Sequence, residues 1–111
     1  MSLDIRFYLE TGGDPEGIKV FETNITHNVG VMAREAGIYK SIWRPDEMGV
    51  KCAGEIVETI EGGLERMKAN PEKFKLLQHS SWGTYDQFVE WVEEYLNKCK
   101  AIPKARIDVN R

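Results

Sequence analysis

The sequence predicts a small α+β domain in which an antiparallel β-sheet is covered on one face by about three α-helices. Three observations lead to this prediction. Residues 3–9 alternate apolar and polar side chains, which is typical of a strand with one buried face. Residues 29–39, 50–69 and 84–100 instead repeat apolar side chains with the period of an amphipathic helix. Residues 105–109, "ARIDV", return to alternation and are a candidate third strand beside the first two.

Residues 3–23 predict an N-terminal β-hairpin. The buried face of its first strand consists of the odd-numbered apolar residues Leu3, Ile5, Phe7 and Leu9. The segment "TGGDPEG" supplies glycines that accept positive φ and a proline that pre-sets a turn. The strand pattern then resumes in "IKVFET". One covered face and one wet face are expected for such an antiparallel pair.

The first helix is predicted over residues 29–39, where Val29, Met32, Ala33 and Ala36 fall on one helical face. Gly37 followed by an apolar residue indicates a Schellman cap at its end. Residues 40–49 are short and irregular in pattern. Within them, Pro45 with two acidic residues behind it is typical of the first turn of a new helix.

The second helix is predicted over residues 50–69, with its outer face rich in glutamate. Gly62 and Gly63 interrupt this pattern, and they indicate either a kink or a close approach by another backbone. The third helix, over residues 84–100, has the clearest apolar stripe. Thr84 or Asp86 is expected to cap its first turn.

The length and composition fit one globular domain of 111 residues, with 41% hydrophobic and 30% charged residues. The net charge of −3 argues against binding long nucleic acid, because phosphate contacts need clustered Lys and Arg. No apolar run approaches a membrane span, and "MSLDIRFYLETGG" does not resemble a secretion signal. We therefore expect a cytoplasmic protein whose two cysteines, Cys52 and Cys99, are free and mostly buried.

The sequence does not support an enzyme or a cofactor. His27 and His79 are its only histidines, and neither lies in a recognised catalytic motif. Ser80 and Ser81 are adjacent to His79 only in sequence. The histidines and cysteines lack the local spacing of a metal site, so neither a metal nor a cofactor is expected.

The segment "TNITHNVG", residues 23–30, has three readings. Asn24 begins an N-x-T glycosylation acceptor, but this matters only in a secreted chain. Thr26 could cap the following helix by accepting a backbone N–H bond, and Asn24 or Asn28 could do so instead. Because a helix start also presents unpaired N–H groups, the remaining Asn side chains and His27 could form the rim of a ligand site. Capping accounts for only one of these side chains.

Four aromatic side chains at predicted helix ends could wall one pocket against this segment: Tyr39, Trp43, Trp82 and Tyr85. Aromatic walls with a few fixed polar donors are typical of small-ligand sites. Arg34 and Arg44 are the cations nearest in sequence. An ordinary core position remains the alternative for each connector tryptophan.

Three motifs together resemble a family of small proteins encoded in bacteriophage and prophage genomes. They are "NITHNVGVMAREAGIY", "WRPDE" and "WGTYDQFVEWVEEYL", followed by the tail "ARIDVNR". The resemblance extends from Asp4 to Arg111, and Ser81 stands where the family has glycine before the tryptophan. The family has no assigned biochemical activity. The resemblance implies a phage or prophage origin and the bacterial host cytoplasm, and it implies no reaction.

Our leading hypothesis is therefore a non-enzymatic phage accessory protein that binds a small, polar, nucleotide-like ligand and counteracts host defence. The expected contacts are hydrogen bonds from Asn24, Thr26, His27 and Asn28, with Trp43, Trp82 or Tyr85 stacking. An alternative is a protein-interaction module that inhibits a host protein through an acidic face, residues 55–65 or 86–94. A small hydrolase is a third candidate. An open sheet edge would also allow a homodimer.

Overall fold

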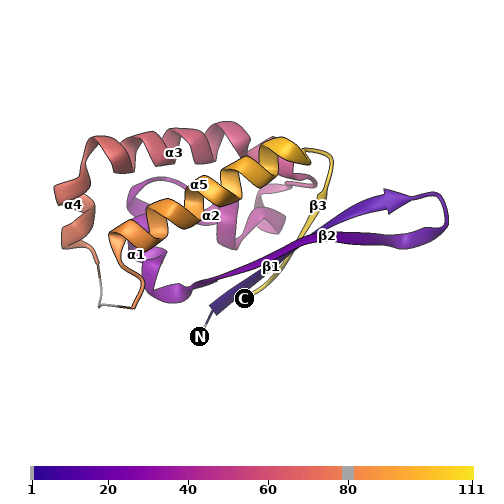
Figure 1. Cartoon of the computed structure of the whole chain (residues 1–111), viewed down its shortest axis with the longest axis horizontal. Coiled ribbons are helices and arrows are strands. Elements are labelled where there is room, and N and C mark those ends of the chain that lie inside the picture. Colours follow the sequence, from indigo (N-terminus) through magenta and orange to yellow (C-terminus); the bar gives the residue numbers. More distant parts are fainter. Residues whose placement is uncertain (1, 79–81) are drawn as a thin grey trace.

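The computed structural model describes residues 2–78 and 82–111 and confirms the predicted α+β fold (Figure 1). The strands β1 (Ser2–Thr11), β2 (Asp14–Thr26) and β3 (Arg106–Asn110) form one antiparallel sheet in the order β2-β1-β3. The α-helices of the described part are α1 (Gly30–Glu35), α2 (Tyr39–Trp43), α3 (Val57–Ala69), α4 (Pro71–Leu76) and α5 (Tyr85–Ala101). Short 3-10 helices are η1 (His27–Val29), η2 (Pro45–Met48) and η3 (Ala53–Ile56).

The candidate third strand is confirmed as β3. It pairs with β1 from Asp4↔Asn110 to Tyr8↔Arg106. On its other edge, β1 pairs with β2 in a register that runs without a shift from Ser2↔Thr26 to Phe7↔Phe21. The next pair is Tyr8↔Lys19, so Val20 is an extra residue that forms a bulge in β2.

The sheet has one covered face and one wet face, as the alternation in the first strand predicts. Leu3, Ile5 and Phe7 are fully buried under the helices. The intervening side chains point to the opposite face, where the Arg6 guanidinium and the Glu22 carboxylate form a 2.8 Å ion pair between exposed groups. Side-chain alternation thus separates the core from solvent within one strand.

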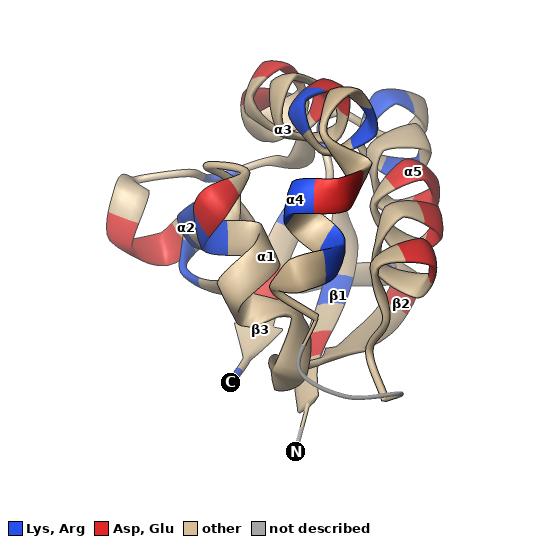
Figure 2. Ribbon diagram, turned by 90° about the vertical axis from the view of Figure 1, so that its left-hand side faces the viewer, with Lys and Arg blue, Asp and Glu red and all other residues tan. Residues whose placement is uncertain are grey.

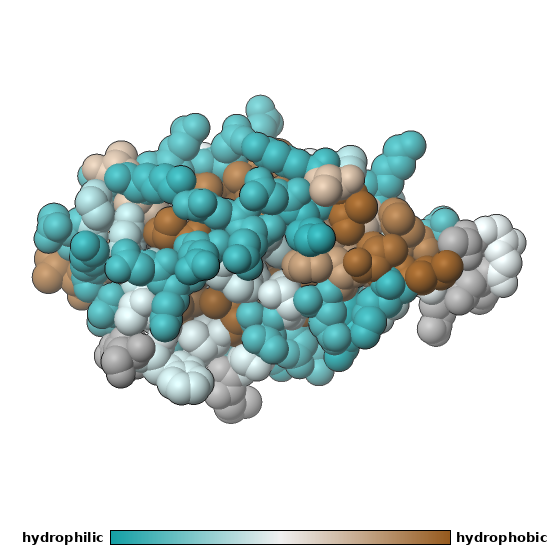
Figure 3. Space-filling view, in the orientation of Figure 1, coloured by the Kyte–Doolittle hydropathy of each residue, from teal (hydrophilic) through white to brown (hydrophobic). Residues whose placement is uncertain are grey.

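Beyond the last pair with β3, the strands β1 and β2 continue as a two-stranded arm (Figure 1). This arm extends beyond the helices, and the molecule is accordingly elongated, with extents of 49 × 27 × 22 Å. Ile18 and Val20 are 54% and 40% exposed there. Hydrophobic surface gathers where the arm meets the C-terminal end of α5 (Figure 3).

The predicted helix at residues 29–39 is shorter than expected, because η1 precedes it and a left-handed Gly37 ends it at φ +79°. The predicted Schellman cap is confirmed. The Ile38 N–H donates to the Ala33 carbonyl at 2.9 Å, and the Gly37 N–H donates to the Arg34 carbonyl at 3.1 Å. The stretch expected to be irregular contains α2, which the sequence analysis missed.

The predicted helix at residues 50–69 begins late, at Val57, and the reason is local. Cys52 forms a β-bridge with Arg106, which holds the chain extended there. The Glu55 carboxylate accepts hydrogen bonds from the backbone N–H groups of Lys51 and Cys52, at 2.5 and 3.1 Å. These bonds cap the turn η3 and keep the preceding residues out of the helix.

The glycine pair lies inside a continuous α3, so the close-approach interpretation is confirmed. A Cβ atom on Gly63 would collide with Ile38 Cγ2 and lie 3.1 Å from the Ala36 carbonyl oxygen. The segment that ends α1 therefore packs directly against the backbone of α3. At the start of α5, Thr84 and Gln87 form the predicted cap as a capping box, with bonds of 3.2 and 3.0 Å.

The helices α3 and α5 lie side by side over the sheet and enclose the core (Figure 1). None of the helices in residues 2–78 and 82–111 combines the length and hydrophobicity that crossing a bilayer requires.

Candidate functional site

A hydrogen bond joins the polar segment after β2 to the end of α2. The Trp43 indole N–H donates to His27 Nδ1 at 3.0 Å. Because Nδ1 accepts this bond, the His27 proton lies on Nε2. Trp43 is only 2% exposed, and the Tyr39 ring stacks on it with centroids 5.2 Å apart. His27 therefore has a structural role, as the partner of a buried indole.

The two neighbours of His27, Thr26 and Asn28, contact Trp82 and Gly83 just before α5. Thr26 Oγ1 accepts from the Asn28 N–H at 3.3 Å, which confirms Thr26 as the cap of η1. The Asn28 side-chain amide donates to the Trp82 carbonyl at 3.3 Å. Gly83 follows with φ +87°, and a Cβ atom there would lie 2.9 Å from Thr26 Cγ2. The "WGTY" segment thus packs on the end of β2.

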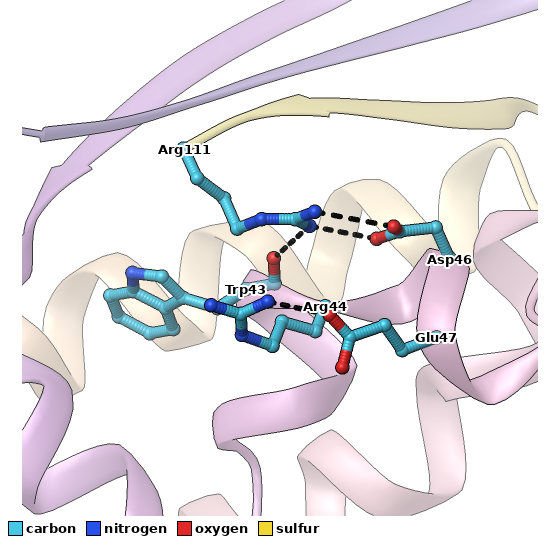
Figure 4. Close-up of polar contacts among 5 residues, drawn as sticks. All are labelled: Trp43, Arg44, Asp46, Glu47 and Arg111. Atoms are coloured by element: carbon cyan, nitrogen blue, oxygen red, sulfur yellow. Dashed lines mark hydrogen bonds and ion pairs between the residues drawn. The ribbon is translucent and has the colours of Figure 1, made fainter.

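Arg111 adds hydrogen bonds to the backbone of Trp43 and to Asp46 (Figure 4). Arg111 Nη1 donates to the Trp43 carbonyl at 3.0 Å and to Asp46 Oδ1 at 2.8 Å, while Nη2 reaches Oδ2 at 3.3 Å. This bidentate pair lowers the pKa of the Asp46 carboxyl. It ties the end of β3 to η2. The "NITHN", "WRPDE" and C-terminal segments are therefore in direct contact.

Two of the four predicted pocket walls belong to the core. Trp43 is buried as described, and Tyr85 is 6% exposed with its hydroxyl donating to the Met67 carbonyl at 2.7 Å. Burial raises the pKa of that hydroxyl. Neither ring has an open face for a ligand to stack on. The core position given as the alternative for the connector tryptophans holds for Trp43, and Tyr85 is a core residue that the sequence analysis did not predict.

Most of the other candidate residues line two separate clefts that share no lining residue, whereas His27 and Asn28 line neither of them. The first, which we name the α1–α2 cleft, has a volume of about 610 Å³. Its lining includes three basic side chains, one acidic side chain and two large side chains with apolar surface: Arg34, Lys40, Arg44, Glu47, Tyr39 and Met48. Figure 2 shows basic and acidic residues side by side around α2.

Two of the three cationic groups of the α1–α2 cleft, Arg34 and Arg44, interact with Tyr39. The Arg34 guanidinium carbon lies 4.0 Å from the Tyr39 ring centroid, in cation–π geometry. The Arg44 guanidinium pairs with Glu47 at 2.5 Å (Figure 4). Glu47, and after it Tyr39, raises the pKa of Arg44. The sequence analysis missed Lys40, because a lone lysine in a connector gives no signal of what it faces.

The second cleft, of about 530 Å³, lies between the end of β2 and the start of α5, and we name it the β2-end cleft. Asn24, Thr26 and Trp82 line it, and Trp82 is 73% exposed. None of the described residues that line it carries a charged side chain. The candidate residues expected to form one pocket are thus divided between two clefts and the core, where Trp43 and Tyr85 are buried.

A further cationic cleft, of about 700 Å³, was not predicted. Lys51, Lys104 and Arg106 line it together with Tyr8, whose ring centroid lies 4.7 Å from the Arg106 guanidinium carbon. We name it the β1–β3 cleft. The bridge between Cys52 and Arg106 brings these basic residues together from distant parts of the chain. A pairing of this kind has no local sequence signature.

Within the described ranges, no group of three or more His, Cys, Asp or Glu side chains could hold a metal ion. Cys52 and Cys99 are free thiols, and burial raises the pKa of Cys99 to about 12. His79, Ser80 and Ser81 lie outside the described residues. Comparisons with models of protein families, with curated proteins and with solved structures find no match for this chain.

Proposed function

We propose that this protein is a non-enzymatic phage or prophage accessory protein that binds a small anionic, nucleotide-like ligand in the α1–α2 cleft. The observation that carries the proposal is that Arg34, Lys40 and Arg44 line one cleft, with Arg34 over the Tyr39 ring. The whole chain has a net charge of −3, whereas the residues that line this cleft include three basic side chains and one acidic side chain. Such a site attracts a small anion without a general basic field.

Two of these cations are held in place before any ligand arrives. Tyr39 stacks on the buried Trp43, Arg34 lies over Tyr39, and Trp43 is fixed by His27. Arg44 is held by Glu47. Ordering of side chains in advance lowers the entropy cost of binding. In the β1–β3 cleft, by contrast, Lys51 and Lys104 make no side-chain ion pair or hydrogen bond within the described part of the chain.

The chemistry of the cleft fits the two halves of a nucleotide. Guanidinium groups bind phosphate oxygens through paired N–H donors, and Arg34 and Arg44 supply two such groups. Lys40 adds a point charge. The half-exposed Met48 supplies apolar surface for a base. Sequestering a nucleotide signal would be one way for such a protein to counteract host defence.

The acidic-face alternative has less support. The Lys68 ammonium pairs with Glu93 at 3.0 Å, and the Lys100 ammonium pairs with Glu61 at 2.7 Å. These bridges between α3 and α5 neutralise part of the acidic surface that an inhibitor mimicking DNA would need (Figure 2).

Calorimetric titration against a panel of mononucleotides, dinucleotides and cyclic nucleotides tests the proposal. We expect heat of binding with at least one member and a matching rise in Tm. Arg34→Gln should weaken the affinity for that member by roughly tenfold or more, because it removes a charged hydrogen-bond donor.

The matched control is Lys104→Gln, which removes the same charge from the β1–β3 cleft. It should leave the affinity within about twofold of the wild type at physiological salt. The proposal fails if no member of the panel gives heat or a thermal shift. It also fails if Lys104→Gln weakens binding as much as Arg34→Gln does.

A further inference from the structure

We propose a second binding site, independent of the first, in which an extended basic peptide adds a strand to the open edge of β2. The site is the groove between β2 and α5, which we name the β2–α5 groove. It comprises two clefts lined by both elements, one at residues 21–23 of β2 and the other at residues 24–26. The occupant is a segment in β conformation that carries Lys or Arg side chains.

The first support is the geometry of the edge. β2 is the outer strand of the sheet, so one side of its backbone pairs with no other strand of the described chain. From Phe21 to Thr26 its register with β1 is regular, and the bulge at Val20 marks where this regular stretch begins. Six residues of strand extend about 20 Å. An unpaired, regular strand of this length is a template for strand addition.

The second support is the pair of clefts beside that edge. Phe21, Thr23 and Trp91 line one of about 420 Å³, and the β2-end cleft of about 530 Å³ follows along the strand. Between them the Trp91 indole N–H donates to Thr23 Oγ1 at 3.0 Å. Alternate side chains of an added strand are about 6.6 Å apart and point to one face, so successive clefts can receive them. In Figures 1 and 2, α5 and β2 lie along the same side of the molecule.

The third support is charge, which selects the occupant. Glu90 and Glu94 are exposed on α5, Glu94 lines the groove, and neither carboxylate is in an ion pair within the described residues. Lys98 also lines the groove, where its ammonium lies 5.4 Å from the Phe21 ring centroid, so one basic side chain stands beside these two carboxylates. A basic peptide would pair with them. A second copy of this chain, paired edge to edge about a two-fold axis, would instead bring two acidic α5 helices together. Charge complementarity therefore favours a peptide over a homodimer.

The floor of the groove contains one further polar group. Tyr95 lines the cleft beside Trp91 and stacks on it with centroids 4.8 Å apart. Its hydroxyl is buried and, among the described residues, has no hydrogen-bond partner. Because this hydroxyl is buried, it does not reach the surface of the groove and gives a bound peptide no hydrogen bond.

Fluorescence anisotropy with a labelled peptide tests the inference. The probe is KVTVKVTVK, blocked at both ends, and its matched control is EVTVEVTVE. We expect the basic peptide to bind and the acidic peptide not to bind. A basic peptide N-methylated at alternate residues, which lacks half of its backbone donors, should bind at least roughly tenfold more weakly.

A pair of charge-reversal variants locates the site. Glu94→Lys should weaken peptide binding roughly tenfold, whereas Glu58→Lys, the same change on α3, should leave it unchanged. Hydrogen exchange should show slower amide exchange at residues 21–26 when the peptide is bound.

Any of four results would overturn the inference. The first is no change in anisotropy when the basic peptide is added. The second is an equal loss of peptide affinity in Glu94→Lys and Glu58→Lys. The third is equal binding by the N-methylated peptide. The fourth is a dimer, seen by ultracentrifugation, that protects residues 21–26 and is not displaced by the peptide. None of these depends on nucleotide binding at the α1–α2 cleft.

Discussion

Trp43 donates its indole N–H to His27 Nδ1 at 3.0 Å, and this bond joins the two most distinctive segments of the sequence. The indole is 2% exposed, so loss of its acceptor would leave a buried donor without a partner. We expect His27→Ala to lower the free energy of unfolding by about 1–3 kcal/mol in urea titrations. Asn24→Ala, an exposed change in the same segment, should alter it by less than about 0.5 kcal/mol. Equal effects of the two changes would refute a structural role for His27.

The adjacent glycines of α3 should respond oppositely to alanine. Gly63→Ala would drive a methyl group into Ile38 and the Ala36 carbonyl, so we expect a loss of about 1–3 kcal/mol. At Gly62 the new methyl would meet only the Arg66 guanidinium, at an ordinary van der Waals distance of 3.7 Å. Removing a helical glycine there should therefore add about 0.5–1 kcal/mol. Thermal unfolding measures the change in stability of each variant. A Gly63→Ala protein that is more stable than the wild type would contradict the close packing at Gly63.

Tyr85 and Tyr95 should also differ in how the loss of their hydroxyl groups changes stability. The Tyr85 hydroxyl donates to the Met67 carbonyl at 2.7 Å, and that carbonyl also accepts from the Asn70 N–H at 3.3 Å. Tyr85→Phe removes only the first of these bonds and should cost about 0.5–1.5 kcal/mol. The Tyr95 hydroxyl is buried and has no hydrogen-bond partner in residues 2–78 and 82–111, and burial raises its pKa well above the usual value. Tyr95→Phe should therefore leave stability unchanged or raise it by up to about 1 kcal/mol. Urea midpoints in the reverse order would show that Tyr95 is the bonded hydroxyl.

The pair between Asp46 and Arg111 predicts a loss of stability in acid. Arg111 holds the pKa of Asp46 below its ordinary value. A carboxyl with a lowered pKa in the folded state stabilises the fold above its unfolded pKa, and this contribution disappears as the pH falls through the folded pKa. Between about pH 5 and about pH 3, the wild type should lose more unfolding free energy than Asp46→Asn does. Identical pH profiles would show that the pair contributes nothing to stability.

Patterns within single elements were sufficient to predict the sheet, its covered face, the Schellman cap at Gly37 and the cap at Thr84. Each of these depends on residues a few positions apart. The late start of α3 and the β1–β3 cleft depend on the bridge between Cys52 and Arg106, which pairs residues distant in sequence. No local pattern contains such information.

In the candidate site, too, local contacts could be predicted from the sequence and long-range contacts could not. Thr26 could be predicted as a cap because its partner is two residues away. The structural roles of His27 and Asn28 could not, because their partners, Trp43 and Trp82, belong to distant segments. Aromatic residues at connector positions look alike in sequence whether they are buried, as Trp43 is, or exposed, as Trp82 is. Only tertiary packing separates the two cases.

The location of a bound nucleotide tests the central claim most directly. Chemical-shift mapping of the isotope-labelled protein, with the tightest nucleotide of the panel, measures it. We predict that the perturbed backbone signals cluster at Gly37, Tyr39, Lys40, Ser41 and Met48, around the α1–α2 cleft. Perturbations confined to Lys51, Lys104 and Arg106, or scattered over no continuous surface, would contradict the account.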